Sequence, residues 1–134
     1  MTMELDYTVA TSMSHADAVR AVVESTETAG FRVQFVHDVA ATLAEKGFSR
    51  EPVTIVEMCN AGYASRVLDA DVKIGLMLPC PIMVYDKDGT TFVSTMRPSL
   101  IGGFFPEAGI ADVAMEVEPV LVGILDGLAA GPRD

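Results

Sequence analysis

Cysteine, histidine and tryptophan are scarce in this chain of 134 residues, which has two cysteines, two histidines and no tryptophan. Two cysteines in a chain of this length do not make the disulfide framework of a small secreted domain. Their positions, Cys59 and Cys80, match neither the spacing of a zinc knuckle nor a CxxC redox motif. We therefore expect two free, reduced thiols.

Positively charged residues are also few. Nine lysines and arginines stand against nineteen acidic residues, which gives a net charge of −10 and a pI near 4.4. Such a surface repels phosphate backbones and anionic lipid, so it argues against nucleic-acid and membrane binding. No apolar run reaches the ~18 residues of a membrane span, and the acidic start "MTMELDYT" does not resemble a secretory signal. We expect a cytoplasmic protein.

Half of the residues are hydrophobic, which predicts a folded chain with one substantial core. We expect a single domain over residues 1–134, with frayed ends at about 1–5 and 130–134. Periodicity and turn residues predict the following elements: strand 6–13, helix 14–30, strand 31–38, short helix 39–47, strand 52–59, helix 61–71, a hairpin within 74–98, a glycine-rich loop 99–109 and a helix 110–130 that bends at Pro119.

Asp88–Gly89 between two β-rich arms is a strong hairpin signal. With these two residues as the loop, Tyr85 faces Phe92, Met83 faces Ser94 and Cys80 faces Arg97. The whole pattern predicts an α+β fold in two layers, a mostly antiparallel sheet with helices packed on one face.

The segment "VEMCNAGYA", residues 56–64, is the most informative part of the chain. Asn60 fits the N-cap of the following helix, which places Cys59 beside exposed amide groups and the positive end of the helix dipole. A thiol in that place ionises more easily, and the thiolate is both a nucleophile and a soft metal ligand. The same N-terminus would also suit an anion. Alternatively, Cys59 is a small buried core residue.

Three further residues complete the candidate site. Cys80 opens the next strand between two prolines, so antiparallel pairing would bring both cysteines to the same end of the sheet. Arg97, opposite Cys80 in the hairpin, would favour a thiolate. Glu57 alternates with Cys59 and would share its face of the strand. The candidate ligand-binding residues are thus Cys59, Asn60, Cys80, Glu57 and Arg97.

These residues favour a domain that binds a small ligand or cofactor, for which a sulfur species, a soft metal and haem are the candidates. A thiol-dependent enzyme using Cys59 is the first alternative, but it lacks an identifiable general base because His37 is not clearly placed. His15 is expected to be exposed in a capping turn, and no Ser-His-Asp constellation is evident. The second alternative is a non-catalytic interaction module that uses the loop "GGFFPEAG".

A homodimer is expected because the strands carry more apolar surface than one helix layer buries. The residues concerned are Val33, Val53, Ile55, Val84 and Val93. The association surface would be the second face of the sheet or the "GGFFPEAG" loop.

Residues 53–89, "VTIVEMCNAGYASRVLDADVKIGLMLPCPIMVYDKDG", resemble the bacterial and archaeal family called domain of unknown function 302. That family has a strand ending in Glu-x-Cys-Asn-Pro and a Leu-Leu-Pro-Cys segment that opens a later strand; the matching residues are Glu57, Cys59, Asn60, Pro79 and Cys80. Ala61 departs from the family's proline, which loosens the helix start without removing its cap. The resemblance spans roughly residues 7–128. It implies a two-layer α+β fold similar to the TATA-binding-protein class, often dimeric, and no established activity.

Overall fold

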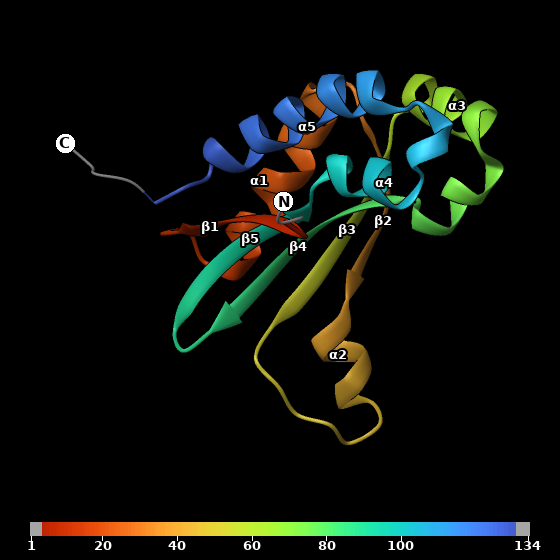
Figure 1. Ribbon diagram of the computed structural model, residues 1–134. Coiled ribbons are helices and arrows are strands. Elements are labelled where there is room, and N and C mark those ends of the chain that lie inside the picture. Colours follow the sequence, from red (N-terminus) through yellow and green to blue (C-terminus); the bar gives the residue numbers. More distant parts are fainter. Residues whose placement is uncertain (1–3, 131–134) are drawn as a thin grey trace.

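The computed structural model describes residues 4–130, which form a five-stranded sheet in the order β1-β5-β4-β3-β2 (Figure 1). Every neighbouring pair is antiparallel. The strands are β1 (Asp6–Thr11), β2 (Arg32–Asp38), β3 (Val53–Cys59), β4 (Cys80–Lys87) and β5 (Thr90–Met96). The helices are α1 (His15–Thr28), α2 (Val39–Ala44), α3 (Ala61–Ala70), α4 (Pro98–Phe104) and α5 (Ala111–Asp126), with 3₁₀ turns η1 (Val72–Met77) and η2 (Pro106–Ala108).

Three helices begin at a capping side chain, and Asn60 among them is the N-cap predicted above. The side chains of Ser14, Asp38 and Asn60 accept hydrogen bonds from backbone N–H groups three residues further on, at 3.2, 2.9 and 3.2 Å. Each cap satisfies a donor that the first turn of a helix leaves without a partner. The starts of α1, α2 and α3 are therefore fixed by local sequence.

The β4–β5 hairpin is also confirmed. Asp88 and Gly89 both have positive φ, 52° and 82°, which is the geometry of the tight turn that Asp-Gly favours. Tyr85 pairs with Phe92 and Met83 pairs with Ser94. The ladder ends at Ile82–Thr95, before it would reach Cys80 and Arg97.

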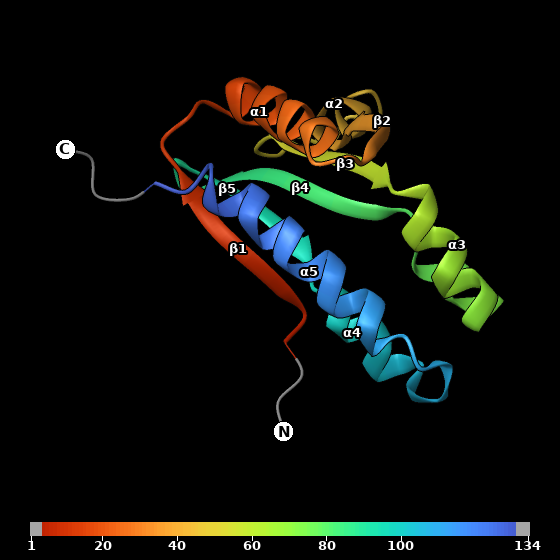
Figure 2. The same cartoon turned by 90° about the horizontal axis from the view of Figure 1, so that it is seen from above.

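Two long helices cover one face of the sheet (Figures 1 and 2). Helix α1 packs over β2, β3 and β4, and α5 packs over β1 and β5. The fully buried side chains between the layers include Val22, Val56, Met58, Ile82, Val84 and Leu121. The predicted two-layer α+β architecture is confirmed. No helix of the described residues is long and apolar enough to cross a membrane.

The glycine-rich loop expected over residues 99–109 is wrong, because this stretch forms α4 and η2. Pro98 occupies the first helical position, where its missing N–H costs nothing. Leu100 and Ile101 are buried against the core and hold the helix in place despite its glycines. Phe104 is 61% exposed, whereas Phe105 packs against the core.

His15 is not the exposed residue that its capping turn suggested, since only 18% of its side chain is accessible. Its Nδ1 lies 3.0 Å from Asp86 Oδ1 and its Nε2 lies 2.8 Å from Thr54 Oγ1. A carboxylate only accepts, so Nδ1 carries the proton and Nε2 accepts from the Thr54 hydroxyl when the ring is neutral. Thr91 also donates to Asp86. This network fastens the start of α1 to β3, β4 and β5.

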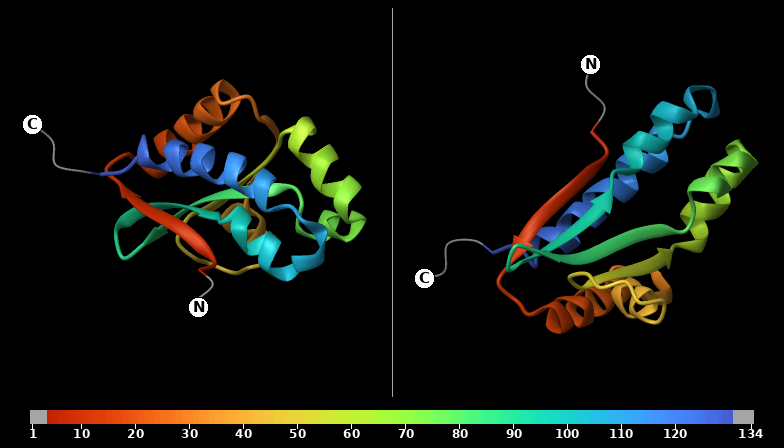
Figure 3. Two further views of the ribbon diagram at one scale, coloured as in Figure 1. Left: turned by 45° about the horizontal axis from the view of Figure 1, so that its top comes forward. Right: turned by 90° about the horizontal axis from the view of Figure 1, so that it is seen from below.

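Neither long helix covers the second face of the sheet, which we call the open face; of the described helices, only the short α2 lies against the sheet on this side, next to β3 (Figure 3, right). Two rows of cross-strand partners cross it: Ile55, Met83 and Ser94, and next to them Val53, Tyr85 and Phe92. Phe35 on the edge strand is 55% exposed. Of the five residues counted above as excess apolar strand surface, Val84 and Val93 are instead fully buried under the helices, and Val33 packs against the same core, because they occupy the alternate positions of their strands.

The ends of the described chain make backbone contacts with the sheet. Leu5 accepts a hydrogen bond from Arg97 N–H, and Ala130 donates one to Ala10. The outer parts of the ends where fraying was expected, residues 1–3 and 131–134, lie outside the described residues.

Candidate functional site

Cys59 and Cys80 lie at the same end of the sheet, as the antiparallel pairing predicted. Met58, the neighbour of Cys59, pairs directly with Cys80. Both cysteines are free, half-buried thiols. Both line one pocket, which we call the cysteine pocket, between the sheet and helices α3, α4 and α5.

The walls of the cysteine pocket are almost entirely apolar. Phe31, Tyr63, Val67, Ile74, Ile101 and Val117 contribute to them from several different elements and connections. The free volume inside is about 50 Å³, enough for one or two groups of the size of a water molecule. Cys59, Asn60 and Cys80 supply the few polar atoms.

Asn60 fixes the start of α3 through both the oxygen and the nitrogen of its side-chain amide. Its Oδ1 accepts from Tyr63 N–H and its Nδ2 donates to the Gly30 carbonyl at 3.2 Å. Gly30 has φ of +93° and ends the turn that leads from α1 into β2. One side chain, directly after Cys59, thus joins the turn between α1 and β2 to the first turn of α3.

Replacing Asn60 with alanine should lower the free energy of unfolding by about 1 kcal/mol through loss of the cap, and somewhat more through loss of the Gly30 contact. Asn60→Ser is the matched control, because serine also caps helices but is too short to keep both bonds. We expect the urea midpoint to be highest for the wild type, lower for Asn60→Ser and lowest for Asn60→Ala. An alanine variant as stable as the wild type would show that Asn60 does not fix the start of α3.

Burial controls the chemistry of Cys80. Removal from water, followed by the nearby Cys59, raises the pKa of the Cys80 thiol to about 11. A buried thiol resists ionisation because the thiolate loses its hydration. At neutral pH Cys80 is therefore an uncharged S–H group.

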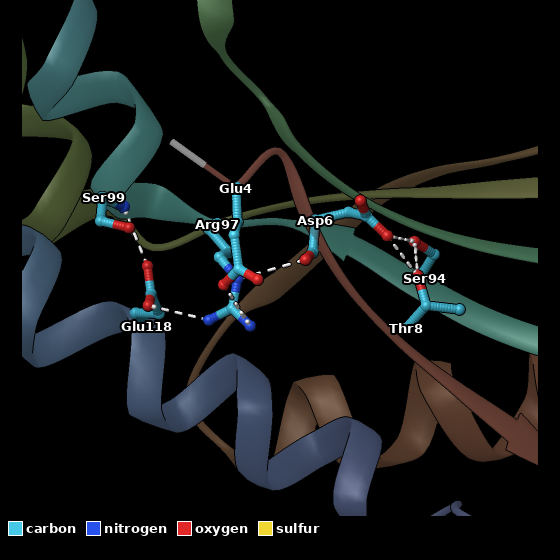
Figure 4. A network of polar contacts seen from close by, with 7 residues as sticks. All are labelled: Glu4, Asp6, Thr8, Ser94, Arg97, Ser99 and Glu118. Carbon is cyan, nitrogen blue, oxygen red and sulfur yellow. Dashed lines mark hydrogen bonds and ion pairs between the residues drawn. The ribbon is translucent and has the colours of Figure 1, made fainter. Parts of the chain in front are cut away.

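Glu57 and Arg97 do not line the cysteine pocket. Glu57 pairs with Phe35 and Pro81 and belongs to the open face. The Arg97 guanidinium lies 3.3 Å from Glu118 and 3.6 Å from Glu4 (Figure 4). Only Cys59, Asn60 and Cys80 of the five candidate residues come together at this pocket.

Helix α3 closes the outer side of the cysteine pocket. Arg66 on α3 pairs with Glu116 on α5 at 2.6 Å, and the Arg66 guanidinium lies 6.0 Å from the centre of the Tyr63 ring. The Tyr63 ring in turn lies 6.0 Å from that of Phe31. Sequence reasoning missed the wall residues Tyr63 and Phe31, although the position of Tyr63 three residues after the cap was a usable signal.

The donor set of the pocket limits which cofactors suit it. No histidine lines it, since His15 contacts Asp86 and His37 pairs with Ile55 on the open face. Haem would lack an axial histidine there, and the volume is far too small for a macrocycle. Within residues 4–130 no three metal-binding side chains gather. Two thiols, one of them with a strongly raised pKa, are a poor donor set for most metals.

Comparison with known proteins gives a consistent result. The family model described as "Domain of unknown function DUF302" matches residues 7–128. A crystal structure of an uncharacterized conserved protein DUF302 from Bacillus stearothermophilus is 31% identical, with a TM-score of 0.88. The alignment covers 94% of this chain and 99% of that one. No curated protein matches. The match over nearly the whole chain, with the same fold, shows that the protein belongs to the DUF302 family.

Proposed function

We propose that this domain binds a small sulfur species in the cysteine pocket and carries it on Cys59. The observation behind the proposal is that both cysteines of the chain line one apolar pocket beside a helix N-terminus. Among the ligand types that the sequence suggested, the pocket disfavours haem by size and metals by its donors. A sulfur atom is soft and weakly hydrated, which suits apolar walls.

The size of the pocket supports a ligand of one or two heavy atoms. A persulfide on Cys59 adds a single sulfur atom, comparable with the free volume of about 50 Å³. The neutral Cys80 thiol offers a weak S–H donor to that atom. Apolar surroundings would shield the persulfide from water and from charged reagents.

The chemistry needs only a polysulfide as donor. The Cys59 thiolate attacks the outer sulfur of the polysulfide and forms a new S–S bond. The donor's own S–S bond breaks, and the shortened polysulfide leaves with the electron pair. Protonation then gives the Cys59 persulfide, so atoms and electrons balance without a further oxidant. A cytoplasmic location, where thiols stay reduced, belongs to the same proposal.

Cold cyanolysis of polysulfide-treated protein tests this proposal, because cyanide removes the outer sulfur of a persulfide as thiocyanate. We expect about one thiocyanate per chain from the wild type and from Cys80→Ala, and almost none from Cys59→Ser. Equal yields from all three proteins, at the level of the Cys59→Ser background, would contradict it.

A thiol-dependent enzyme is the weaker alternative. Apart from the two thiols and the Tyr63 phenol, the residues that line the pocket have no titratable side chain. A nucleophilic enzyme normally places a general base within hydrogen-bond reach of its nucleophile. The geometry therefore favours storage or sensing of a ligand over turnover.

We propose in addition that two copies of the chain associate through their open faces. Ile55, Met83, Tyr85 and Met96 line a hollow of about 340 Å³ on that face, and the Tyr85 and Phe92 rings stack at 5.3 Å beside it. Exposed apolar faces of this kind usually form an interface with another molecule. The net charge of −10 disfavours nucleic acid or anionic lipid as that partner, whereas a second copy presents the same apolar rows and closes the assembly.

A further inference from the structure

A second concave site lies on the other side of α5 from the cysteine pocket. We call it the α5 groove. It has a volume of about 560 Å³, within the range of small-molecule sites. Small or apolar residues of α4, η2 and α5 form most of its surface: Gly102, Phe105, Pro106, Ala114, Met115 and Val122. Ala114 and Ile110 separate it from the cysteine pocket, because they line both.

One end of the α5 groove carries hydrogen-bond acceptors. Pro119 lies inside α5 and has no N–H, so the carbonyl of Met115 lacks its helical partner. Both residues line the groove. Glu118 is adjacent to Pro119 and lines the groove as well, and its carboxylate contacts Ser99, another residue of the lining. Apart from the Ser99 hydroxyl, which also lines the groove and can either donate or accept, these groups only accept, so a ligand that donates hydrogen bonds suits this end.

Glu118 keeps capacity to accept further bonds. Its Oε1 accepts from Ser99 N–H at 2.9 Å and its Oε2 faces Arg97 at 3.3 Å. A carboxylate has about four lone-pair positions, so about half remain free. Partial burial alone would raise the pKa of Glu118, but the Ser99 hydrogen bond and the Arg97 charge outweigh it and lower the pKa. Glu118 is therefore ionised at neutral pH.

The charge balance at this end is negative. Arg97 is shared between two carboxylates, those of Glu118 and Glu4 (Figure 4). One positive charge thus faces two negative charges, and the chain as a whole carries −10. An incoming cation would be attracted, and an anion repelled.

We propose that the α5 groove binds a small organic amine, with its alkylammonium group on Glu118 and the Met115 carbonyl and its apolar part along α4 and η2. An ammonium group supplies three N–H donors and no acceptor, which matches the acceptors at this end. The apolar walls then accept the carbon chain. This site is independent of the cysteine pocket and of its proposed ligand.

Titration with n-hexylamine, followed by ¹⁵N–¹H NMR, tests the proposal, with hexanoate and 1-hexanol as probes of matched chain length. We expect saturable shifts around Gly102 and Ala114 for the amine, and at least about tenfold weaker binding for hexanoate. Glu118→Gln should weaken amine binding about tenfold, because a charge-assisted hydrogen bond is lost. Glu107→Gln removes the same charge from η2, outside the groove lining, and should change the affinity for the amine by less than about twofold.

Pro119→Ala provides a second test that does not touch a charged group. Alanine restores the N–H that occupies the Met115 carbonyl, so amine binding should weaken about threefold while the helix gains stability. Hexanoate binding as tightly as the amine would overturn the proposal. So would equal amine affinities of the Glu118→Gln and Glu107→Gln proteins. If Glu118→Gln fails to fold, an unchanged affinity in Pro119→Ala overturns it.

Discussion

Iodoacetamide at pH 8 should modify Cys59 while leaving Cys80 almost untouched. The pKa of Cys80 lies near 11 instead of 9.0, so its thiolate population is about a hundredfold smaller than that of an unshifted thiol. Only the thiolate reacts. Since a raised pKa means that the proton is lost later, the rate at Cys80 should climb with pH until about pH 11 and level off above it.

Peptide mass spectrometry after timed alkylation measures both rates in one sample. Cys59→Ser and Cys80→Ala confirm the assignment of each rate, and the same reaction in urea gives the rate of the unfolded chain. In urea the two cysteines should react alike, because the environments that distinguish them are gone. Equal, fast modification of both thiols in the folded protein at pH 8 would show that Cys80 is not shielded from solvent.

Placing a carboxylate at the centre of the open face should break the proposed dimer. Met83→Glu introduces a charge on the central strand β4, beside Ile55 and Ser94. An unpaired charge in an apolar interface costs several kcal/mol, so the dimer dissociation constant should rise about a hundredfold or more. Sedimentation equilibrium over a range of micromolar concentrations measures it.

Met115→Glu is the matched control for this experiment. Met115 is 74% exposed on α5, on the opposite side of the molecule from the open face. The same substitution there adds the same charge without touching the interface, so the dimer should persist. A wild-type mass of 14.2 kDa at every concentration would refute the dimer.

The parts of the fold that could be predicted from sequence are those fixed by neighbouring residues. An N-cap such as Asn60 acts on amides within one turn, and the Asp88–Gly89 turn sets the hairpin register by itself. The positions of Cys59 and Cys80 followed from one further step, antiparallel pairing. These features need no knowledge of the distant chain.

The wrong predictions concern residues whose packing and hydrogen-bond partners lie far away in the sequence. His15 looked exposed because its burial depends on Asp86 and Thr54, which are remote in sequence. The stretch that forms α4 was expected to be a loop because glycine has a low helix propensity. In the structure, the packing of Leu100 and Ile101 against the core stabilises the helix instead. Tertiary packing overrode local propensity in both cases.

In the candidate site, too, the features set by neighbouring residues could be predicted and those set by distant residues could not. Sequence placed the two thiols and Asn60 together, but the walls of the cysteine pocket come from α3, α4 and α5 at once. Arg97 was expected beside Cys80 from the hairpin register. It instead turns toward Glu118 and Glu4, because the ladder ends before that pair and two carboxylates attract the guanidinium more strongly than a neutral thiol.

Native mass spectrometry of polysulfide-treated protein tests the central proposal, that Cys59 carries sulfur in the cysteine pocket, most directly. The wild type and Cys80→Ala should each gain the mass of one sulfur atom per chain, and Cys59→Ser should gain none. The same spectrum reports whether the sulfur-bearing species is the dimer. A folded wild type that carries no more sulfur than Cys59→Ser would contradict the proposal.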